Sequence, residues 1–264
     1  MAGNLEISTV VGCKMRCSYC PQTAHIENYS NRVGKKKSLF QMTLLQFSEY
    51  ISSVPQEVDI VFAGMAEPFL NPETTSMIQL AYDKGHTISV YTTGEGVTIE
   101  DIEILEKRKF NHFCIHLPDG DGDMNLTVDE NYIEIIKKLK PISNNVMCIG
   151  NLHPKLKEVV GDVPNSRLSL FSRAGALKEL MIPRKSGKLF CSVCTDSLNH
   201  NVLMPNGDVL LCCMDYHQKH IIGNLNTHNY SEIFETEEYK RVLSGLQDET
   251  IDILCRTCEI SKEI

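Results

Sequence analysis

The chain has 264 residues, of which 42% are hydrophobic and 7% aromatic, and its formal net charge is -8. A chain of this length can form one large domain with a buried core, or one domain with a smaller appendage. The acidic balance disfavours nucleic acid as a main partner, because phosphate binding depends on a basic face, and no apolar run approaches the roughly 18 residues of a membrane span.

The N-terminus, Met1-Ala2-Gly3-Asn4, has neither the basic region nor the apolar core of a secretory signal. The chain nevertheless contains 11 cysteines. Cysteines in a chain without a signal indicate metal ligation in a reducing compartment rather than disulfides. We therefore expect a cytoplasmic, metal-binding protein with no membrane partner.

The first predicted strand covers residues 5–10 and leads into a loop with three cysteines. Cys13, Cys17 and Cys20 form a Cys-x3-Cys-x2-Cys pattern, which can place three thiolates around one soft-metal site. Three ligands without a fourth nearby suit an iron–sulfur cluster with one open iron. Structural zinc would favour four ligands in two separated pairs, and a disulfide framework would pair its cysteines evenly. We predict a cluster, with zinc or a chance pattern as the alternatives.

This loop resembles the signature of the radical S-adenosylmethionine (SAM) enzymes. In that family the open iron of a [4Fe-4S] cluster binds SAM, and an electron from the cluster cleaves SAM to methionine and a 5′-deoxyadenosyl radical. The resemblance implies that Cys13, Cys17 and Cys20 hold this cluster, and that Tyr19, the aromatic residue before the last cysteine, lies beside the adenine of SAM. It also implies a reductant of the flavodoxin or ferredoxin type as a partner.

Strand and helix patterns alternate along the chain to about residue 180. Further strands are predicted at residues 59–64, 87–93, 112–117, 146–149 and 168–171, and helices at 38–53, 71–85, 98–108 and 127–139, with Asn71 as an expected N-cap. Such alternation is typical of parallel βα units. Six units are too few for a closed eight-stranded barrel, so we expect an α/β fold with a partial (β/α)6 barrel and with its chemistry at the carboxyl ends of the strands.

A glycine-containing motif follows the second predicted strand. Its residues, Gly64, Met65, Ala66, Glu67 and Pro68, resemble the Gly-Gly-Glu-Pro motif of the family, whose backbone carbonyls receive the amino group of SAM. Met65 and Ala66 depart from that motif, because small residues are common at both positions. A lone Gly-x-x-Glu-Pro is more often a simple turn, but its position after a strand favours SAM binding.

Polar residues also end the third and fourth predicted strands. Thr92 and Thr93 carry hydroxyls that could bond the ribose or methionine end of SAM, or could serve only the strand end and its turn. His116 could face the substrate, or it could be satisfied by local hydrogen bonds within the protein.

A second cysteine-rich region begins near residue 190. Asn206-Gly207 between apolar runs predicts a β-hairpin, and the helical spacing of apolar residues between 231 and 246 predicts a helix that returns the chain to its last cysteines. Four thiolates can fully ligate a second iron–sulfur cluster, and zinc bound by four thiolates is the alternative. The six thiols of this region are Cys191, Cys194, Cys212, Cys213, Cys255 and Cys258.

The order of these features resembles the twitch domain, a shortened form of the SPASM auxiliary-cluster domain. The twitch domain follows the radical SAM core in the aminocyclitol (2-deoxy-scyllo-inosamine) dehydrogenase group, and the SPASM domain follows it in peptide-modifying enzymes. The resemblance implies a core at residues 1–183 and a small α+β module with a second [4Fe-4S] cluster at residues 184–264. The spacing from Gly207 in that family implies a ligand set of Cys194, Cys212, Cys255 and Cys258.

Arg173 also resembles the dehydrogenase group, in which an arginine followed by two small residues ends the sixth strand and faces the active site. Its guanidinium could hold the SAM carboxylate or a substrate hydroxyl. The alternative is that Arg173 only forms a salt bridge at the surface. Core and module use the whole length, so we expect a small substrate, such as a sugar, cyclitol or nucleotide sugar.

The expected reaction is the two-electron oxidation of an alcohol, with the second cluster as electron acceptor. Fold and cofactor alone do not dictate a reaction, so three alternatives stay open. They are a sugar epimerase with Cys191 or Cys213 as hydrogen donor, a maturase of a ribosomal peptide, and a non-catalytic electron carrier.

Overall fold

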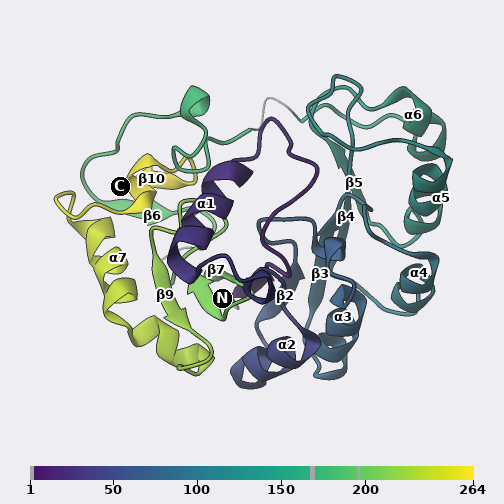
Figure 1. Cartoon of the computed structure of the whole chain (residues 1–264). Helices are drawn as coiled ribbons and strands as arrows, with labels where there is room; N and C mark the ends of the chain where they lie inside the picture. The colour runs from purple at the N-terminus through teal and green to yellow at the C-terminus, as the bar shows by residue number, and fades with distance from the viewer. Residues whose placement is uncertain (1–2, 167–169, 195–196) are drawn as a thin grey trace.

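An eight-stranded sheet runs through the centre of the molecule (Figure 1). The computed structural model describes residues 3–166, 170–194 and 197–264. Within these residues five parallel strands lie in the order β5-β4-β3-β2-β1, as the partial barrel requires. They are β1 (Asn4–Ile7), β2 (Asp59–Phe62), β3 (Ile88–Thr92), β4 (His112–Leu117) and β5 (Asn145–Cys148).

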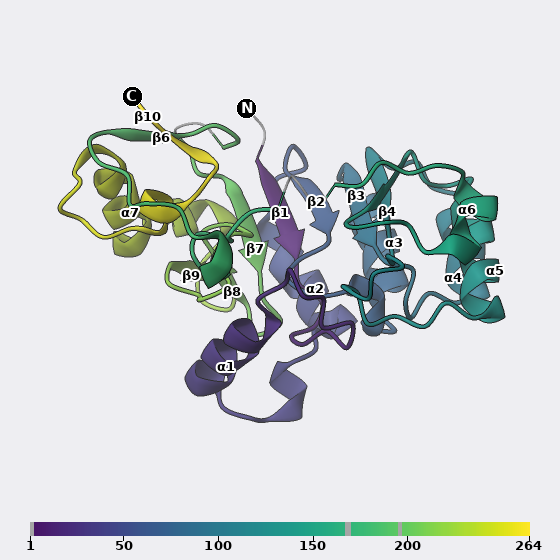
Figure 2. The same cartoon turned by 90° about the horizontal axis from the view of Figure 1, so that it is seen from above.

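Helices follow the strands and cover one face of the sheet (Figure 2). They are α2 (Leu44–Tyr50), α3 (Thr74–Asp83), α4 (Ile99–Leu105), α5 (Glu130–Leu139) and α6 (Pro154–Val160). Short 3-10 turns lie at Lys37–Leu39, Ile51–Ser53, Pro68–Leu70 and Lys178–Leu180. The α/β fold class and the partial barrel are therefore confirmed.

The two faces of the sheet differ because side chains alternate along each strand. On β1, Leu5 and Ile7 are fully buried in the main hydrophobic core, against the helices. Glu6 lies between them and points to the opposite face, which we call the interior face. The strand register places Glu6 beside Val61 of β2, and Tyr91 of β3 beside Cys114 of β4, on this face.

Three strands of the C-terminal part extend this sheet. The strand β7 (His200–Leu203) pairs in parallel with β1, and β8 (Asp208–Leu210) and β9 (Ile221–Asn224) continue the sheet beyond it. The hairpin predicted at Asn206-Gly207 joins β7 and β8, with Gly207 at φ 88°. The sequence did not indicate that β7 would pair with β1.

The rest of the C-terminal part packs beside the hairpin. The predicted helix at residues 231–246 forms as a 3-10 turn at Tyr230–Glu235 followed by α7 (Glu237–Gln247). The strands β6 (Leu189–Cys191) and β10 (Ser261–Glu263) form a small antiparallel sheet, and the last 3-10 turn is Leu254–Thr257.

Two predicted helices begin later than expected. Residues 40–42 bond to the backbone after β1, through Val11 N to Phe40 O at 2.8 Å and Met42 N to Thr9 O at 2.9 Å, so they cannot form the start of a helix at residue 38. The N-cap of α3 is Glu73 and not Asn71, because residues 71–73 form a turn before the helix begins at Thr74. Asn71 Oδ1 accepts a hydrogen bond from the Glu73 N–H at 3.0 Å within this turn, and its Nδ2 donates to the Met42 carbonyl at 2.7 Å.

The sequence analysis missed α1 (Gln22–Val33), which lies apart from the other helices in Figure 2. Its polar composition hid it, although Ile26, Tyr29 and Val33 recur at helical spacing. Half of the predicted sixth strand, residues 168 and 169, lies outside the described residues, and residues 170 and 171 are not in a strand. Just before it, Asn165 forms a parallel bridge with Cys148 of β5.

Candidate active site and metal centres

The cysteine loop leaves the carboxyl end of β1 and is fixed to the loop after β4. The Ser18 N–H donates to the carbonyl of Asp123 at 2.8 Å, and the Asn125 N–H donates to the carbonyl of Met15 at 2.9 Å. These bonds hold the middle of the motif against a neighbouring strand end, where parallel βα folds gather their chemistry. The predicted ligands of this loop are partly exposed free thiols: Cys13, Cys17 and Cys20.

The sulfur atoms of this loop have specific neighbours. Cys20 Sγ lies 3.6 Å from Nε2 of Gln22 and 3.8 Å from the hydroxyl oxygen of Tyr216. Burial is the main cause that raises the pKa of the Cys17 thiol to about 12; negative charge on Cys20 and Cys13 contributes to the rise, and a hydrogen bond with Tyr19 opposes it. A bound cationic metal group would stabilise the thiolate, so ligation by this loop would be coupled to loss of the thiol proton.

The turn after β2 lies against β1. Gly64 has φ 64°, and a Cβ atom at this position would lie 2.6 Å from Ser8 Cα and 2.9 Å from the carbonyl oxygen of Ile7. The Gly64 N–H donates to Oε1 of Glu6 at 3.1 Å. Because a side chain would displace the backbone of β1, this position requires glycine.

Met65 and Ala66, which depart from the family motif, occupy different environments. Met65 is buried in the smaller hydrophobic cluster with Val11 and Tyr29, and its carbonyl accepts a hydrogen bond from the side chain of Gln22. Ala66 is partly exposed. The Met65 side chain therefore fills the core, and a SAM amino group that used its carbonyl would have to share that oxygen with Gln22.

Glu67 joins the ends of β2 and β3. Its Oε1 accepts hydrogen bonds from Thr92 Oγ1 at 2.6 Å and from the Phe69 N–H at 3.2 Å. Its Oε2 accepts from the Thr93 N–H at 2.6 Å and from Thr93 Oγ1 at 2.7 Å. Burial raises the pKa of Glu67, and these hydrogen bonds oppose that rise. The side chain is thus a structural link beneath the predicted SAM site.

The two threonine hydroxyls already have partners within the protein. Thr92 Oγ1 also accepts a hydrogen bond from the Gly94 N–H at 2.9 Å, and Thr93 Oγ1 accepts from the Glu95 N–H at 3.3 Å. Each hydroxyl thus has one donor and one acceptor partner. These contacts favour the role at the strand end and turn, and a contact with SAM stays a prediction.

His116 lies on the interior face of β4, against Tyr19 of the cysteine loop. The two rings stack with centroids 5.9 Å apart at an angle of 29°, and the Tyr19 hydroxyl lies 3.4 Å from His116 Nε2. Burial lowers the pKa of His116 to about 4, so the imidazole is neutral at pH 7. The structure thus brings together two residues that the sequence singled out for different reasons.

Arg173 stands in an unusual backbone segment. Arg173, Ala174 and Gly175 have positive φ values of 53°, 50° and 89°, which for the first two residues is a strained conformation. The segment is held by Ser172, whose Oγ accepts from the Gly175 N–H at 3.0 Å. The guanidinium lies 5.7 Å above the ring of Tyr216, so the segment directs a fixed positive charge inward and not to the surface.

Glu6 was missed by the sequence analysis. It shares the interior face with Tyr91, which is 41% exposed although it lies in a central strand. Burial raises the pKa of Glu6, while the positive charge of Arg173 and a hydrogen bond with Cys213 oppose that rise. A charged residue between the apolar residues Leu5 and Ile7 was the available signal.

The six cysteines of the C-terminal part line one cavity of about 220 Å³. Cys191 Sγ lies 3.2 Å from Cys194 Sγ, and the other four come from the chain after β8 and around the last 3-10 turn. Glu6 and Arg173 belong to the same cavity wall. The structure therefore brings the predicted auxiliary site and the interior face of the barrel together.

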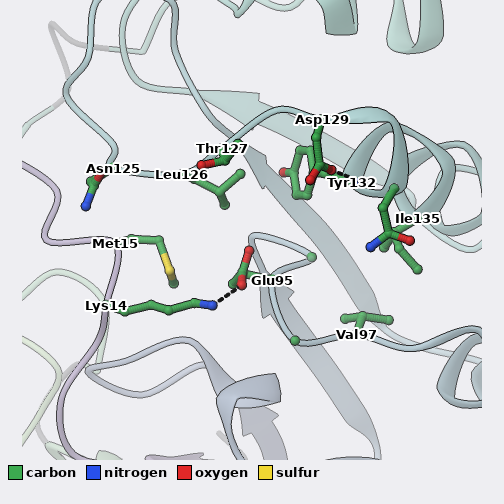
Figure 3. A pocket seen from close by; sticks show the side chains of 13 residues that line it. Lys14, Met15, Glu95, Val97, Asn125, Leu126, Thr127, Asp129, Tyr132 and Ile135 are labelled. Atoms are coloured by element: carbon green, nitrogen blue, oxygen red, sulfur yellow. Dashed lines mark hydrogen bonds and ion pairs between the residues drawn. The ribbon is translucent and has the colours of Figure 1, made fainter.

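A larger cavity, of about 570 Å³, opens beside the cysteine loop (Figure 3). Its wall includes Lys14 and Met15 of that loop, the turn at residues 94–97 and the segment around residues 125–132. Lys14 and Glu95 form an ion pair in this wall. The sequence did not predict this cavity, because its wall comes from three segments that are far apart in the chain.

Two known protein families match the chain. The Radical SAM superfamily matches residues 7–158, more than half of the chain. The chain belongs to the radical SAM superfamily. A second family, SPASM, described as an iron–sulfur cluster-binding domain, matches residues 191–259, so this radical SAM enzyme carries an auxiliary iron–sulfur domain. Both resemblances drawn from the cysteine patterns are thus confirmed.

Several solved structures share the fold, although no curated protein sequence matches the chain. BtrN in complex with AdoMet and 2-DOIA is 19% identical, with a TM-score of 0.66 over 98% of this chain and 93% of that one. SuiB of Streptococcus suis bound to the precursor peptide SuiA is 11% identical, with a TM-score of 0.57 over 98% and 70%. AnSMEcpe with AdoMet and the Cp18Cys peptide is 15% identical, with a TM-score of 0.55 over 97% and 86%.

At such low sequence identities, these structures show only that the fold is similar. Among the described residues, no helix is both long and apolar enough to cross a membrane.

Proposed function

We propose that this radical SAM enzyme oxidises an alcohol group of a small carbohydrate-like substrate to a ketone, with a second [4Fe-4S] cluster as electron acceptor. The observation that carries the proposal is the shared wall of the 220 Å³ cavity, in which Glu6 and Arg173 lie with the C-terminal thiols. An electron acceptor beside the substrate pocket suits an oxidation, because the electron can leave the substrate directly. BtrN, which has a similar fold, binds AdoMet and the small molecule 2-DOIA.

Iron–sulfur clusters are favoured over zinc by the family matches. Four thiolates around one zinc ion lie about 3.8 Å from one another, because each Zn–S bond is about 2.3 Å. The structure describes every cysteine of the chain, and among them no three sulfur atoms lie within 4.8 Å of one another, so no closed zinc site is preformed. The match to an iron–sulfur cluster-binding domain supports a second cluster beside that of the radical SAM core. We assign Cys13, Cys17 and Cys20 to the first, and Cys194, Cys212, Cys255 and Cys258 to the second.

When bound, SAM on a reduced first cluster would supply the 5′-deoxyadenosyl radical that removes a hydrogen atom from a substrate carbon, and the second cluster would accept one electron. Arg173 is proposed to hold the substrate oxygen, because its guanidinium carries a fixed charge on the interior side. Glu6 is proposed to accept the proton of the substrate hydroxyl. Burial raises the pKa of Glu6, which makes its carboxylate a stronger base.

Residues near the predicted SAM site have positioning roles in this proposal. His116 bonds the Tyr19 hydroxyl and would orient that ring beside the adenine of SAM. Gly64, Met65 and Ala66 would present backbone carbonyls to the amino group of SAM. Thr92 and Thr93 would act mainly through Glu67, which both contact.

The remaining parts of the proposal concern the organisation and partners of the enzyme. We propose a radical SAM core at residues 1–183 and an auxiliary module at residues 184–264, although β7 of the module extends the sheet of the core. A flavodoxin or ferredoxin is the proposed reductant, and the cytoplasm the proposed location.

Iron content and SAM cleavage test the cofactor assignment. Anaerobic reconstitution should yield about eight irons per chain if both clusters contain four. Replacing Cys13, Cys17 and Cys20 together by alanine should remove about four irons and abolish 5′-deoxyadenosine formation. Four irons with one zinc would contradict the second cluster, and continued deoxyadenosine formation in the triple variant would contradict the first.

A radical epimerase is the second candidate. The thiol of Cys213 is hydrogen-bonded to Glu6 on the interior side, and it could donate a hydrogen atom to a substrate radical. Turnover of candidate sugars and cyclitols in deuterium oxide separates the two reactions. The oxidation should yield a ketone with no deuterium at the reacting carbon. Deuterium fixed at that carbon without net oxidation would favour the epimerase, and modification of a precursor peptide would exclude both.

A further inference from the structure

A short segment of the C-terminal part connects the two proposed cluster sites. Cys212 lines the 220 Å³ cavity, and four residues later the hydroxyl of Tyr216 lies 3.8 Å from Cys20 Sγ of the first site. The turn between them is tight, since the Asp215 N–H donates to the carbonyl of Cys212 at 3.1 Å. The auxiliary module thus contributes a side chain to the surroundings of the radical SAM cysteines.

The turn that carries Tyr216 is rigid. The buried carboxylate of Asp215 accepts hydrogen bonds from the backbone N–H groups of Lys219 and His220, each at 2.8 Å. The Gln218 N–H donates to the carbonyl of Asp215 at 3.0 Å. Because these bonds close the turn on itself, the position of Tyr216 relative to Cys212 is well determined.

The ring of Tyr216 is held on two sides. His25 of α1 meets it edge-on, with centroids 5.7 Å apart at an angle of 68°, and the Arg173 guanidinium lies 5.7 Å above its face. Only 6% of the residue is exposed. These neighbours restrict the hydroxyl to the region of the Cys20 sulfur.

The chemistry of the pair decides which atom donates. A cysteine that ligates a cluster is a thiolate and has no proton, so the tyrosine hydroxyl must be the donor of this hydrogen bond. Gln22 Nε2, at 3.6 Å, is a second donor to the same sulfur atom. Hydrogen bonds to ligand sulfurs raise the reduction potential of an iron–sulfur cluster, because they stabilise the extra negative charge of the reduced form.

We propose that Tyr216 is a positioning residue that acts through Cys20: its hydroxyl donates a hydrogen bond to this sulfur atom and raises the reduction potential of the first cluster. The inference rests on the proposed ligation of that cluster by Cys13, Cys17 and Cys20, but not on the substrate or the reaction. It makes the auxiliary module a part of the electronic environment of the radical SAM site.

The potential of the first cluster tests this proposal in the holoenzyme. Tyr216→Phe keeps the ring and its contacts and removes only the hydroxyl. EPR-monitored redox titration should show a more negative midpoint potential for the cluster whose signal changes on addition of SAM, while the second cluster keeps its potential. Tyr29→Phe is the matched control, because it removes a buried hydroxyl that donates to the carbonyl of Leu39 at 2.6 Å and not to sulfur. This control should shift neither potential.

A second variant covers the case in which Tyr216→Phe fails to load iron. Site-specific 3-fluorotyrosine at position 216 has a more acidic hydroxyl and is a stronger donor, so it should shift the potential in the positive direction. An unchanged potential in a variant that retains its iron would overturn the proposal, and so would equal shifts of both clusters. A chain that holds no iron at the first three cysteines would instead contradict the proposed ligation itself.

Discussion

Replacement of Glu67 by glutamine tests how the ends of β2 and β3 are held together. The change keeps the shape of the side chain but replaces one acceptor oxygen by an NH2 donor. If the NH2 group takes the place of Oε2, it faces the Thr93 N–H, and if it takes the place of Oε1, it faces the Phe69 N–H. A backbone N–H cannot reverse its role, so either orientation leaves one buried donor without its acceptor.

The size of the effect follows from these contacts. An unpaired buried donor costs about 1–3 kcal/mol, and hydrogen bonds to a neutral acceptor are weaker than the 1.5–3 kcal/mol typical of bonds to a charged one. Removal of a buried charge offsets part of this loss. We expect Glu67→Gln to lower the free energy of unfolding by about 3 kcal/mol, and the midpoint of thermal unfolding by roughly 6–12 °C.

Anaerobic thermal unfolding of the cluster-loaded protein, followed by circular dichroism, measures this shift. The control is Glu49→Gln, the same chemical change at an exposed position, which should move the midpoint by less than about 2 °C. Calorimetric titration with SAM should also show weaker binding to Glu67→Gln, because Gly64, Met65 and Ala66 lose their anchor. A midpoint within about 2 °C of the wild type would refute the argument that Glu67 accepts these bonds as a carboxylate.

Three further predictions address other parts of the molecule. Gly64→Ala should prevent stable folding or SAM binding, because its Cβ would lie 2.6 Å from Ser8 Cα. Gly187→Ala is the control, because Gly187 has nearly the same φ (60° against 64°) but no atom within 4 Å of the added Cβ, and it should retain SAM binding by calorimetry. Cys194→Ser should lose about four irons and Cys191→Ser should keep about eight; the reverse pattern would exchange the proposed ligands. Burial lowers the pKa of His25 to about 4 from its usual 6.5. Between pH 4 and pH 6.5 this imidazole therefore binds a proton in the unfolded chain but not in the folded one. Stability should therefore fall by up to about 3 kcal/mol as the pH drops from 6.5 to 4, and unfolding midpoints of His25→Gln should show a weaker pH dependence; an equal dependence would show that His25 is not responsible.

The first cysteine motif could be predicted because its three ligands are close in the chain. The loop that contains Cys13, Cys17 and Cys20 follows its strand directly, and its spacing alone indicated a radical SAM enzyme. The Asn206-Gly207 hairpin was likewise a local turn signal, confirmed by β7 and β8. The parallel sheet followed from short apolar runs that alternate with helical patterns.

Contacts between distant segments could not be predicted in this way. Glu67 accepts hydrogen bonds from Thr92, 25 residues away, so the sequence could not show that the threonine hydroxyls already had partners. Tyr216 meets Cys20 across 196 residues, and no local pattern distinguished it from other core tyrosines. Glu6 was hidden for a related reason: its significance depends on Arg173, which approaches it only in the folded chain.

The amino-acid sequence by itself determined the ligand types and the alternation of strands and helices after β2, because thiolate spacing and hydrophobic periodicity act over a few residues. Only the tertiary structure decided which elements became neighbours, and the pairing of β7 with β1 is the clearest case. Either edge strand of the parallel sheet, β1 or β5, could have paired with β7, since backbone N–H and C=O groups are the same in every strand. Side-chain packing over the whole molecule selected β1, and that choice brought Glu6, Arg173 and the C-terminal thiols into one cavity wall.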